Sequence, residues 1–391
     1  MSLIRKTLKT IIHLLSGAAL SLLAWRVGGY EWLSILILPL WAVTTRKIDS
    51  FAVMFGYYLT FSMDAPDAVN RFGDPKLAQV GVALWLFHAA MLSIPWIRIG
   101  PKMWMQAAIV IIFTALPPFG AFNWAHPFLA AGQIFPGSGI YGLMLAYLML
   151  IWLVFVVSKP IPSIWFGVRG GAIIIPVFLF SATSSILVST YADKLTPSGW
   201  VAENTHFGGS ARGLPDTERH IRMAGISSLA AKEGGRVVIF PEEVGGVWSP
   251  DYAKLWNLGD RSVTQIVGAD MPYKGLIVLN AAIEAKSGLA IASARVPMPV
   301  GDWWFTGPSA KSNIFSNNVK TIDGVKSSFI FCYEEFLVYP LMIDSLSGAK
   351  AIISMANVWS SAGMPAQAIQ RRSIELQARL YGLPLIRAEN I

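Results

Sequence analysis

The sequence predicts a multi-span α-helical membrane domain, residues 1–191, followed by an α/β domain, residues 192–391. The chain is 54% apolar and 14% charged, whereas an average soluble domain is about 45–50% apolar and about 25% charged. Long apolar runs fill the first half, while short β-rich runs alternate with helical stretches in the second half. These two patterns divide the chain into a lipid-embedded half and a water-exposed half.

Seven apolar segments in the first half predict membrane-spanning helices. A span requires about 17–25 predominantly apolar residues. Five segments approach or exceed this length, and two shorter ones are included because their polar flanks then give a consistent topology. The first segment lacks a clear cleavage site, so we interpret it as a retained anchor. The segments are residues 8–25, 32–43, 51–63, 77–97, 103–119, 139–158 and 168–191.

The positive charges of the short loops predict the orientation of these spans. Residues 1–191 carry 12 Lys and Arg against 5 Asp and Glu. With a cytoplasmic N-terminus and seven spans, nine of those cations face the cytoplasm and three face the opposite side, as the positive-inside rule requires. Residues 192–391 then lie outside the cytoplasm. They carry 19 Lys and Arg against 18 Asp and Glu, which gives no basic surface for nucleic acid.

The second half has the alternating strands and helices of an α/β domain. Its single cysteine, Cys332, excludes a disulfide framework and a cysteine-rich zinc site, and we expect no metal and no cofactor. The predicted strands are residues 236–240, 276–279, 289–292, 328–331 and 351–354, with 276–279 and 289–292 forming a pair. The predicted helices are residues 216–233 and 364–381.

Two of the predicted strands end in residues whose side chains could take part in catalysis. One runs into Phe240-Pro241-Glu242-Glu243, and the other runs into Phe331-Cys332-Tyr333-Glu334. A thiol directly after a buried strand and beside carboxylates is typical of a nucleophile with its base. Taken alone, however, a lone cysteine is more often a small core residue, and a glutamate pair after a strand is more often a solvated loop.

The order of these motifs resembles that of the nitrilase, or carbon–nitrogen hydrolase, superfamily. Phe-Pro-Glu242 resembles the Trp-Pro-Glu of its apolipoprotein N-acyltransferase branch, and Cys332-Tyr-Glu resembles the Cys-Tyr-Glu of that branch. Ser354-Met-Ala-Asn357-Val-Trp resembles the Ser-Asn-Asp-Ala-Trp loop, with a slip of one residue. The segment from Gln370 to Asn390 resembles the helix and strand that come after this loop. The overall pattern is most like the TraB-type conjugal-transfer proteins of plasmids.

The resemblance implies an α-β-β-α sandwich with a Glu, Lys, Cys triad. It implies that Glu242 is the general base and Cys332 the acylated nucleophile, with Tyr333, Glu334 and Asn357 in support. The middle motif of the family ends in Val-Pro-Phe-Gly-Glu. Here Met-Pro-Val-Gly-Asp302 is similar to it, with an aspartate in place of the glutamate, so Asp302 joins the supporting residues.

The lysine of the family has no direct counterpart in this sequence. Counting back from Asp302 gives Ala294, and the nearest cation is Arg295. We therefore expect Arg295 to stabilise the oxyanion, although an arginine stays charged and cannot share protons. Lys274 and Lys286 lie further upstream, and a loop rearrangement would be needed to bring either of them in.

Three functions remain open. The first is a membrane-anchored cysteine acyltransferase or amidase that acts on a lipid or lipoprotein, in the bacterial inner membrane with the second domain in the periplasm. The second is a catalytically degenerate scaffold that contacts conjugation proteins. The third, a transporter, is the weakest, because the spans contain few charges and no inverted repeat. The loop around His126 and the segment Trp303-Trp304-Phe305 suggest acyl-chain access or, alternatively, interfacial anchoring.

Overall fold

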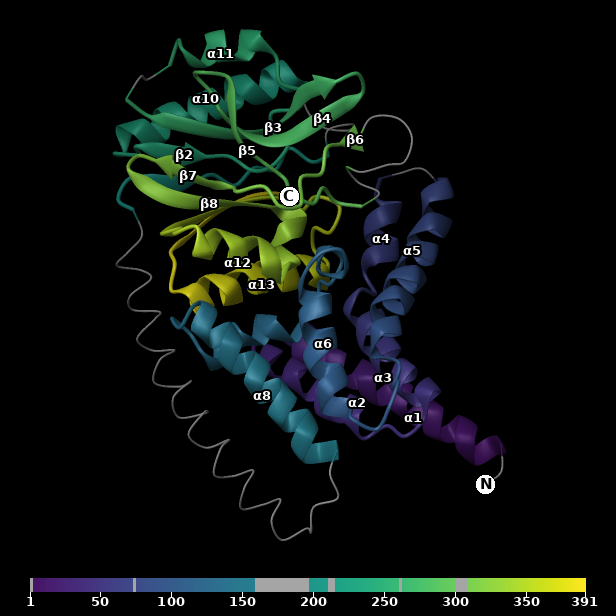
Figure 1. Ribbon diagram of the computed structural model, residues 1–391. Coiled ribbons are helices and arrows are strands. Elements are labelled where there is room, and N and C mark those ends of the chain that lie inside the picture. Colours follow the sequence, from purple (N-terminus) through teal and green to yellow (C-terminus); the bar gives the residue numbers. More distant parts are fainter. Residues whose placement is uncertain are drawn as a thin grey trace. The chain divides into compact units, whose positions relative to one another are not determined.

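Figure 1 shows the computed structural model of the protein. The structure describes residues 3–72, 75–158, 197–209, 215–259, 262–299, 302 and 309–391. The chain forms two compact units. The first unit comprises Met1–Tyr191, Phe336–Tyr339 and Met364–Gly382, and the second comprises Ala192–Glu335, Pro340–Gly363 and Leu383–Ile391.

The described part of the first unit is helical. Its helices are α1 (Leu3–Ser21), α2 (Ile37–Ala42), α3 (Lys47–Phe61), α4 (Ala65–Asn70), α5 (Pro75–Ser93), α6 (Met103–Ala115), α7 (Ala131–Ile134), α8 (Ile140–Ser158) and α13 (Pro365–Tyr381). Among the described residues, three helical segments are long and apolar enough to cross a membrane: Leu3–Arg26, Gln79–Trp96 and Ile140–Ser158. These correspond to the predicted spans 8–25, 77–97 and 139–158.

The other predicted spans differ from expectation in length. Helix α6 has 13 residues, and α3 has 15. At about 1.5 Å of rise per residue, each is shorter than the roughly 30 Å hydrocarbon core of a bilayer. Segment 32–43 begins as a 3-10 helix before α2. The predicted span 168–191 lies outside the described residues.

Helices α1 and α3 pack closely because a glycine on each helix lies against the backbone of the other helix. A Cβ atom added to Gly17 would lie 1.9 Å from the carbonyl oxygen of Val53, and one added to Gly56 would lie 2.1 Å from the carbonyl oxygen of Leu14. Neither contact can accommodate a methyl group. Small residues of this kind let two helix backbones approach each other, as is typical of helices that associate in membranes.

The part of the loop between α6 and α7 that contains His126 is buried within the first unit. His126 is 1% exposed, and its ring nitrogens hydrogen-bond to the carbonyl oxygen of Ile111 and the backbone N–H of Phe128. The stretch from Phe128 to Ala131 is also buried. The ring of His126 therefore faces the interior of the unit, and this burial does not support the acyl-chain access expected of the loop.

Helix α13 belongs to the first unit although it lies near the end of the sequence. Its N-terminus is capped by Asp64, whose Oδ2 accepts a hydrogen bond from the backbone N–H of Ala366 at 2.8 Å. Arg372 on the same helix forms an ion pair with Glu31 at 2.7 Å. A Cβ atom at Gly132 would lie 1.9 Å from the carbonyl oxygen of Leu376, so α7 and α13 also pack closely.

The second unit contains two β-sheets. The first has the order β1-β2-β3-β4-β5, with β6 beside β4, and the second has the order β10-β9-β8-β7. The predicted pair at 276–279 and 289–292 is confirmed as the antiparallel strands β4 and β5. The strands are β1 (Trp200–Ala202), β2 (Val237–Ile239), β3 (Thr264–Lys274), β4 (Ile277–Glu284), β5 (Leu289–Ser293), β6 (Ser309–Ala310), β7 (Val319–Ile322), β8 (Val325–Phe331), β9 (Ala351–Asn357) and β10 (Leu385–Asn390).

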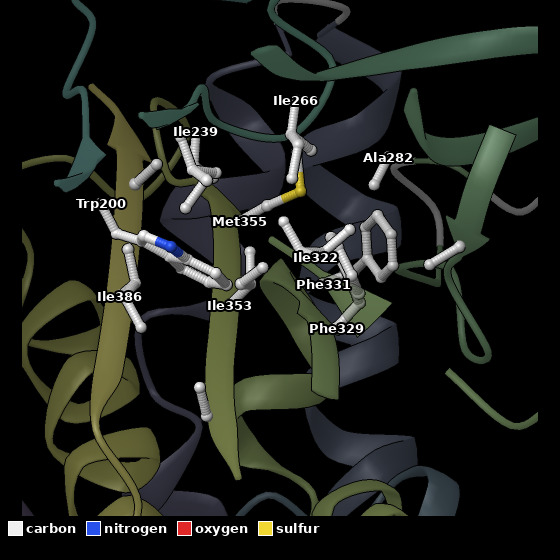
Figure 2. Close-up of a cluster of buried hydrophobic side chains, with 14 of the residues drawn as sticks. Trp200, Ile239, Ile266, Ala282, Ile322, Phe329, Phe331, Ile353, Met355 and Ile386 are labelled. Atoms are coloured by element: carbon white, nitrogen blue, oxygen red, sulfur yellow. The ribbon is translucent and has the colours of Figure 1, made fainter. Parts of the chain in front are cut away.

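The two sheets face each other across a hydrophobic core. Figure 2 shows Ile239 and Ile266 from the first sheet lying opposite Phe329, Ile353 and Met355 from the second. Each of these five side chains is fully buried. Burial on this scale is the main stabilising contribution to such a sandwich, at about 25 cal/mol per Å² of apolar surface.

Helices cover the outer faces of both sheets. Helices α10 (Asp216–Lys232) and α11 (Pro250–Trp256) lie on one side of the first sheet in Figure 1, and Met223 and Trp256 join its outer core. Helix α12 (Val338–Leu346) contacts the second sheet through the hydrogen bond from Ser328 to Asp344. The predicted fold class, a helical region followed by an α-β-β-α sandwich, is confirmed.

Candidate active site

Cys332 lies where strand β8 ends and a 3-10 helix, Cys332–Phe336, begins. Its side chain is buried, with 8% exposed, and the thiol donates a hydrogen bond to the carbonyl oxygen of Asn357 at 3.4 Å. Strands β8 and β9 are parallel, so their carboxyl ends meet at one edge of the sheet. This edge is the usual location of a functional site in α/β proteins.

Glu242 meets the thiol from the other sheet. It follows strand β2, is 4% exposed, and accepts a hydrogen bond at Oε1 from the side-chain amide of Asn280 at 2.8 Å. Burial raises the pKa of Glu242 well above its ordinary value, and the nearby charge of Asp302 adds to this, while hydrogen bonds from Asn280 and from Cys332 oppose it. A carboxylate with a raised pKa is a better match for a thiol proton.

Glu243 adds a second carboxylate that the sequence interpretation treated as a solvated loop residue. Its backbone lies in the left-handed region, with φ at 57°, a conformation that non-glycine residues adopt mainly where the surroundings enforce it. Its Oε2 accepts a hydrogen bond from the Asn357 amide at 3.0 Å, and its side chain also hydrogen-bonds to Asp302. Both glutamates of the motif are therefore part of the site.

Asp302 is held by the loop that leads to it. Its Oδ2 accepts a hydrogen bond from the backbone N–H of Met298 at 3.0 Å. Burial raises the pKa of Asp302 to about 6, and burial together with the charge of Asp302 raises the pKa of Asp270 to about 7. The site thus gathers several carboxyl groups that keep their protons to unusually high pH.

Arg295 is buried away from solvent and is held by groups other than the thiol. Its guanidinium pairs with Asp344, lies 3.5 Å from Glu334, and donates to the carbonyl oxygens of Ser316 and Phe329. Among the residues that the structure describes, its partners include neither Glu242 nor Cys332. These contacts do not support the expected oxyanion contact; they indicate that Arg295 positions Glu334.

Glu334 and Glu335 fix the turn that begins with Cys332. Glu334 accepts hydrogen bonds from the backbone N–H groups of Arg295 and Val296, while Glu335 pairs with Arg387 at 2.7 Å. Tyr333, between the thiol and these carboxylates, is 5% exposed. Buried ion pairs on both sides therefore hold the turn that begins with Cys332 in one conformation.

The structure places no lysine at the position expected from the resemblance. Ala294 is 2% exposed and joins the core between the sheets. Lys274 is exposed beside the ring of Tyr273, and Lys286 donates to the carbonyl oxygen of Val263. No group of three metal-binding side chains occurs among the described residues. The segment Trp303-Trp304-Phe305 lies outside them.

The raised pKa values predict that the second unit loses stability as pH rises. Asp302 and Asp270 have ordinary pKa values of 3.8 and folded values of about 6 and about 7. The folded state therefore binds more protons than the unfolded state between about pH 4 and 7, and the free energy of unfolding falls across that window. At about 1.4 kcal/mol per pKa unit the two shifts amount to several kcal/mol, so we expect the unfolding temperature to drop by roughly 10 °C or more, at about 2–4 °C per kcal/mol.

Thermal unfolding of the full chain in detergent, between pH 4.5 and pH 8, measures this effect. Asp302→Asn should flatten the dependence, because it removes one titrating group and the charge that acts on Asp270. Asp251→Asn is the matched control, since Asp251 is fully exposed and pairs with Lys254 on the surface. A stability that rises from pH 5 to pH 8 would contradict the assignment.

The fold and the site together define an α/β sandwich with a cysteine and a glutamate at adjoining strand ends. Among solved structures, the chain is similar to an amidase of the nitrilase superfamily from Nesterenkonia AN1, with a TM-score of 0.38, 12% identity, and coverage of 50% of this chain and 78% of that chain. A carbon–nitrogen hydrolase from Helicobacter pylori gives a TM-score of 0.34 at 14% identity over 48% and 72% of the two chains.

Two curated proteins are similar over most of their length. The conjugal transfer protein TraB of Agrobacterium fabrum is 29% identical over 413 residues, which cover 95% of this chain and 92% of that protein. A protein named as a probable conjugal transfer protein TraB from Sinorhizobium fredii is 26% identical over 386 residues, with coverage of 93% and 95%. No family model matches the chain. The resemblance to TraB-type proteins is therefore confirmed.

Proposed function

We propose that this protein is a membrane-anchored cysteine acyltransferase or amide- or ester-cleaving enzyme that serves plasmid conjugal transfer. The buried pair formed by Glu242 and Cys332 carries the proposal. The names of the two TraB relatives support the conjugation role. The three long apolar helices are consistent with membrane association, and we assign the second domain to the periplasm of a bacterial inner membrane on the loop charges.

The proposed reaction has two halves. The Glu242 carboxylate takes the thiol proton of Cys332, and the thiolate attacks the carbonyl carbon of an ester or amide. When the tetrahedral intermediate collapses, the bond to the leaving alcohol or amine breaks, and Glu242 returns its proton to that group. Water or an amine then attacks the thioester, gives a proton to Glu242, and releases the thiol, which takes that proton back.

The supporting residues are assigned from their contacts. Asn280 orients Glu242, Asn357 joins the thiol to Glu243, and Arg295 positions Glu334. A lipid or lipoprotein is the proposed substrate, because the enzyme would share a membrane with it. Burial and, after it, the negative charge of Asp302 raise the pKa of Glu242, which makes its carboxylate a stronger base for the thiol proton.

An acyl adduct on Cys332 tests the proposal. Purified full-length protein is incubated with phospholipid vesicles and analysed by intact mass, and we expect a mass increase of one acyl chain on the sole cysteine of the sequence. Glu242→Gln should slow adduct formation by about 10²–10⁴-fold, the usual contribution of a positioned base. Adduct formation at an unchanged rate in Glu242→Gln would contradict the base assignment.

A second candidate function, a catalytically degenerate scaffold, is favoured by the contacts of Arg295. The cation nearest to the family lysine is committed to Asp344 and Glu334, both fully buried. A scaffold would form no adduct on Cys332 and would act in conjugation through protein contacts alone.

A further inference from the structure

Asn390, the last residue of strand β10, uses its whole side-chain amide in hydrogen bonds. Its Oδ1 accepts from the hydroxyl of Thr205 and from the backbone N–H of Phe207, both at 2.9 Å. Its Nδ2 donates to the carbonyl oxygen of Gly208 at 3.0 Å and to Oδ1 of Asn357 at 2.8 Å. An amide offers two donors and two acceptor lone pairs. Asn390 is buried, with 1% exposed, and its amide can form no further hydrogen bond.

These partners fix the orientation of a second amide. The backbone N–H of Phe207 can only donate and the carbonyl of Gly208 can only accept, so the Oδ1 and Nδ2 atoms of Asn390 cannot exchange places. Because Asn390 donates, Asn357 must accept with its Oδ1 and point its Nδ2 the other way. That Nδ2 donates to Glu243 at 3.0 Å.

The backbone of Asn357 meets the thiol at the same point. Asn390 and Asn357 are paired in the parallel register of β10 and β9, and the N–H of Val358 donates to the carbonyl of Asn390 at 2.9 Å. The carbonyl of Asn357 accepts the hydrogen bond from the Cys332 thiol. One residue thus touches the nucleophile with its backbone and a carboxylate of the site with its side chain.

We propose that Asn390 is a positioning residue for the Cys332 site and that it acts through the side chain of Asn357. It touches neither the thiol nor Glu243 in the contacts above; it holds the amide that contacts them. This inference rests on the proposed function of Cys332, since positioning matters only where the thiol reacts.

The charge balance of the site predicts the effect of removing the Asn390 amide. Burial disfavours the ionised form of Glu243 most, the carboxylates of Asp302, Asp270 and Glu242 add to this effect, and the hydrogen bond donated by Asn357 favours the ionised form. Without this donor Glu243 keeps its proton to higher pH. Less negative charge then lies beside the Glu242–Cys332 pair, and the thiol ionises at lower pH.

Alkylation of Cys332 measures this change without any turnover. Iodoacetamide labelling of the full-length protein reports one thiol, because the sequence has one cysteine. We expect Asn390→Ala to lower the pH midpoint of the alkylation rate by about half a pH unit. Losing a hydrogen bond to a charged group shifts a pKa by roughly one unit, and only part of that shift should reach the thiol. Asn390→Ser, a smaller perturbation, should shift it in the same direction if Asn390→Ala does not fold.

A double-mutant cycle separates positioning from general destabilisation. Asn357→Ala removes the amide that Asn390 holds, so adding Asn390→Ala to it should leave the midpoint where Asn357→Ala alone puts it. Asn204→Ala is the matched control, because Asn204 hydrogen-bonds to the backbone of Glu389 one residue away and should keep the wild-type midpoint. Additive shifts in the double variant, or a wild-type midpoint in Asn390→Ala, would overturn the inference. Absence of an acyl adduct in the wild-type protein would instead overturn the proposed function. The pH dependence of Cys332 alkylation does not depend on that result.

Discussion

Replacing Cys332 by alanine is expected to reduce plasmid transfer to the level of a strain that lacks the protein. The substitution removes the only thiol of the chain, and loss of a nucleophile typically leaves only the residual rate supplied by binding. Transfer frequency between donor and recipient strains, with the variant expressed from a second plasmid, measures the effect.

The same experiment separates the two candidate functions. Cys332→Ala removes one small buried side chain, so the folded protein should remain in the membrane fraction at the wild-type level, and immunodetection checks this. A catalytic protein then loses transfer although its amount is unchanged. Wild-type transfer by a folded Cys332→Ala variant would favour the scaffold.

Replacing Arg295 by methionine is expected to destabilise the second unit by about 3–5 kcal/mol, the usual cost of leaving a buried ion-pair partner unpaired. Asp344 and Glu334 are both fully buried, and each would lose the cation that compensates its charge. Thermal unfolding or denaturant titration of the purified full chain measures the change.

Two further variants test whether this effect comes from the buried charges. Combining Arg295→Met with Asp344→Leu removes one of the two buried carboxylates that have lost their cation. The double variant should therefore recover part of the lost free energy of unfolding. Lys254→Met is the matched control, because Lys254 and Asp251 form an exposed pair that solvent screens and that we expect to contribute little to stability. If Arg295→Met lowers the free energy of unfolding no more than Lys254→Met does, the buried ion pairs of Arg295 do not hold the turn that begins with Cys332.

Local patterns predicted the strands that carry the two motifs but not the central strand beside them. Strand β2 consists of β-branched residues, and strand β8 ends in the aromatic and β-branched run Phe329-Ile330-Phe331. Strand β3 contains Gly268, Asp270 and Pro272, which interrupt any apolar alternation. It forms because β2 and β4 pair with both of its edges, and such pairing is not visible in a local segment.

The sequence likewise predicts the site residues only in part. The position of Cys332 after a strand was visible in the sequence, but Glu242 and Glu243 accept hydrogen bonds from Asn280 and Asn357, which come from distant strands. Likewise, Arg295 was the nearest cation in the chain, yet Asp344 on α12 takes up its guanidinium. Spacing along the chain indicates which residues come near the site, and it does not indicate which acceptor each donor meets.

Helix α13 also determines when this protein can finish folding during synthesis. The first unit lacks its capped helix until Met364–Gly382 has been made, and the second lacks β10 until Leu383–Ile391 has been added. The hydrogen bond between Asp64 and Ala366 joins residues 302 positions apart. Neither unit can therefore be completed before the ribosome has passed Met364, and the early helices remain without α13 during most of translation.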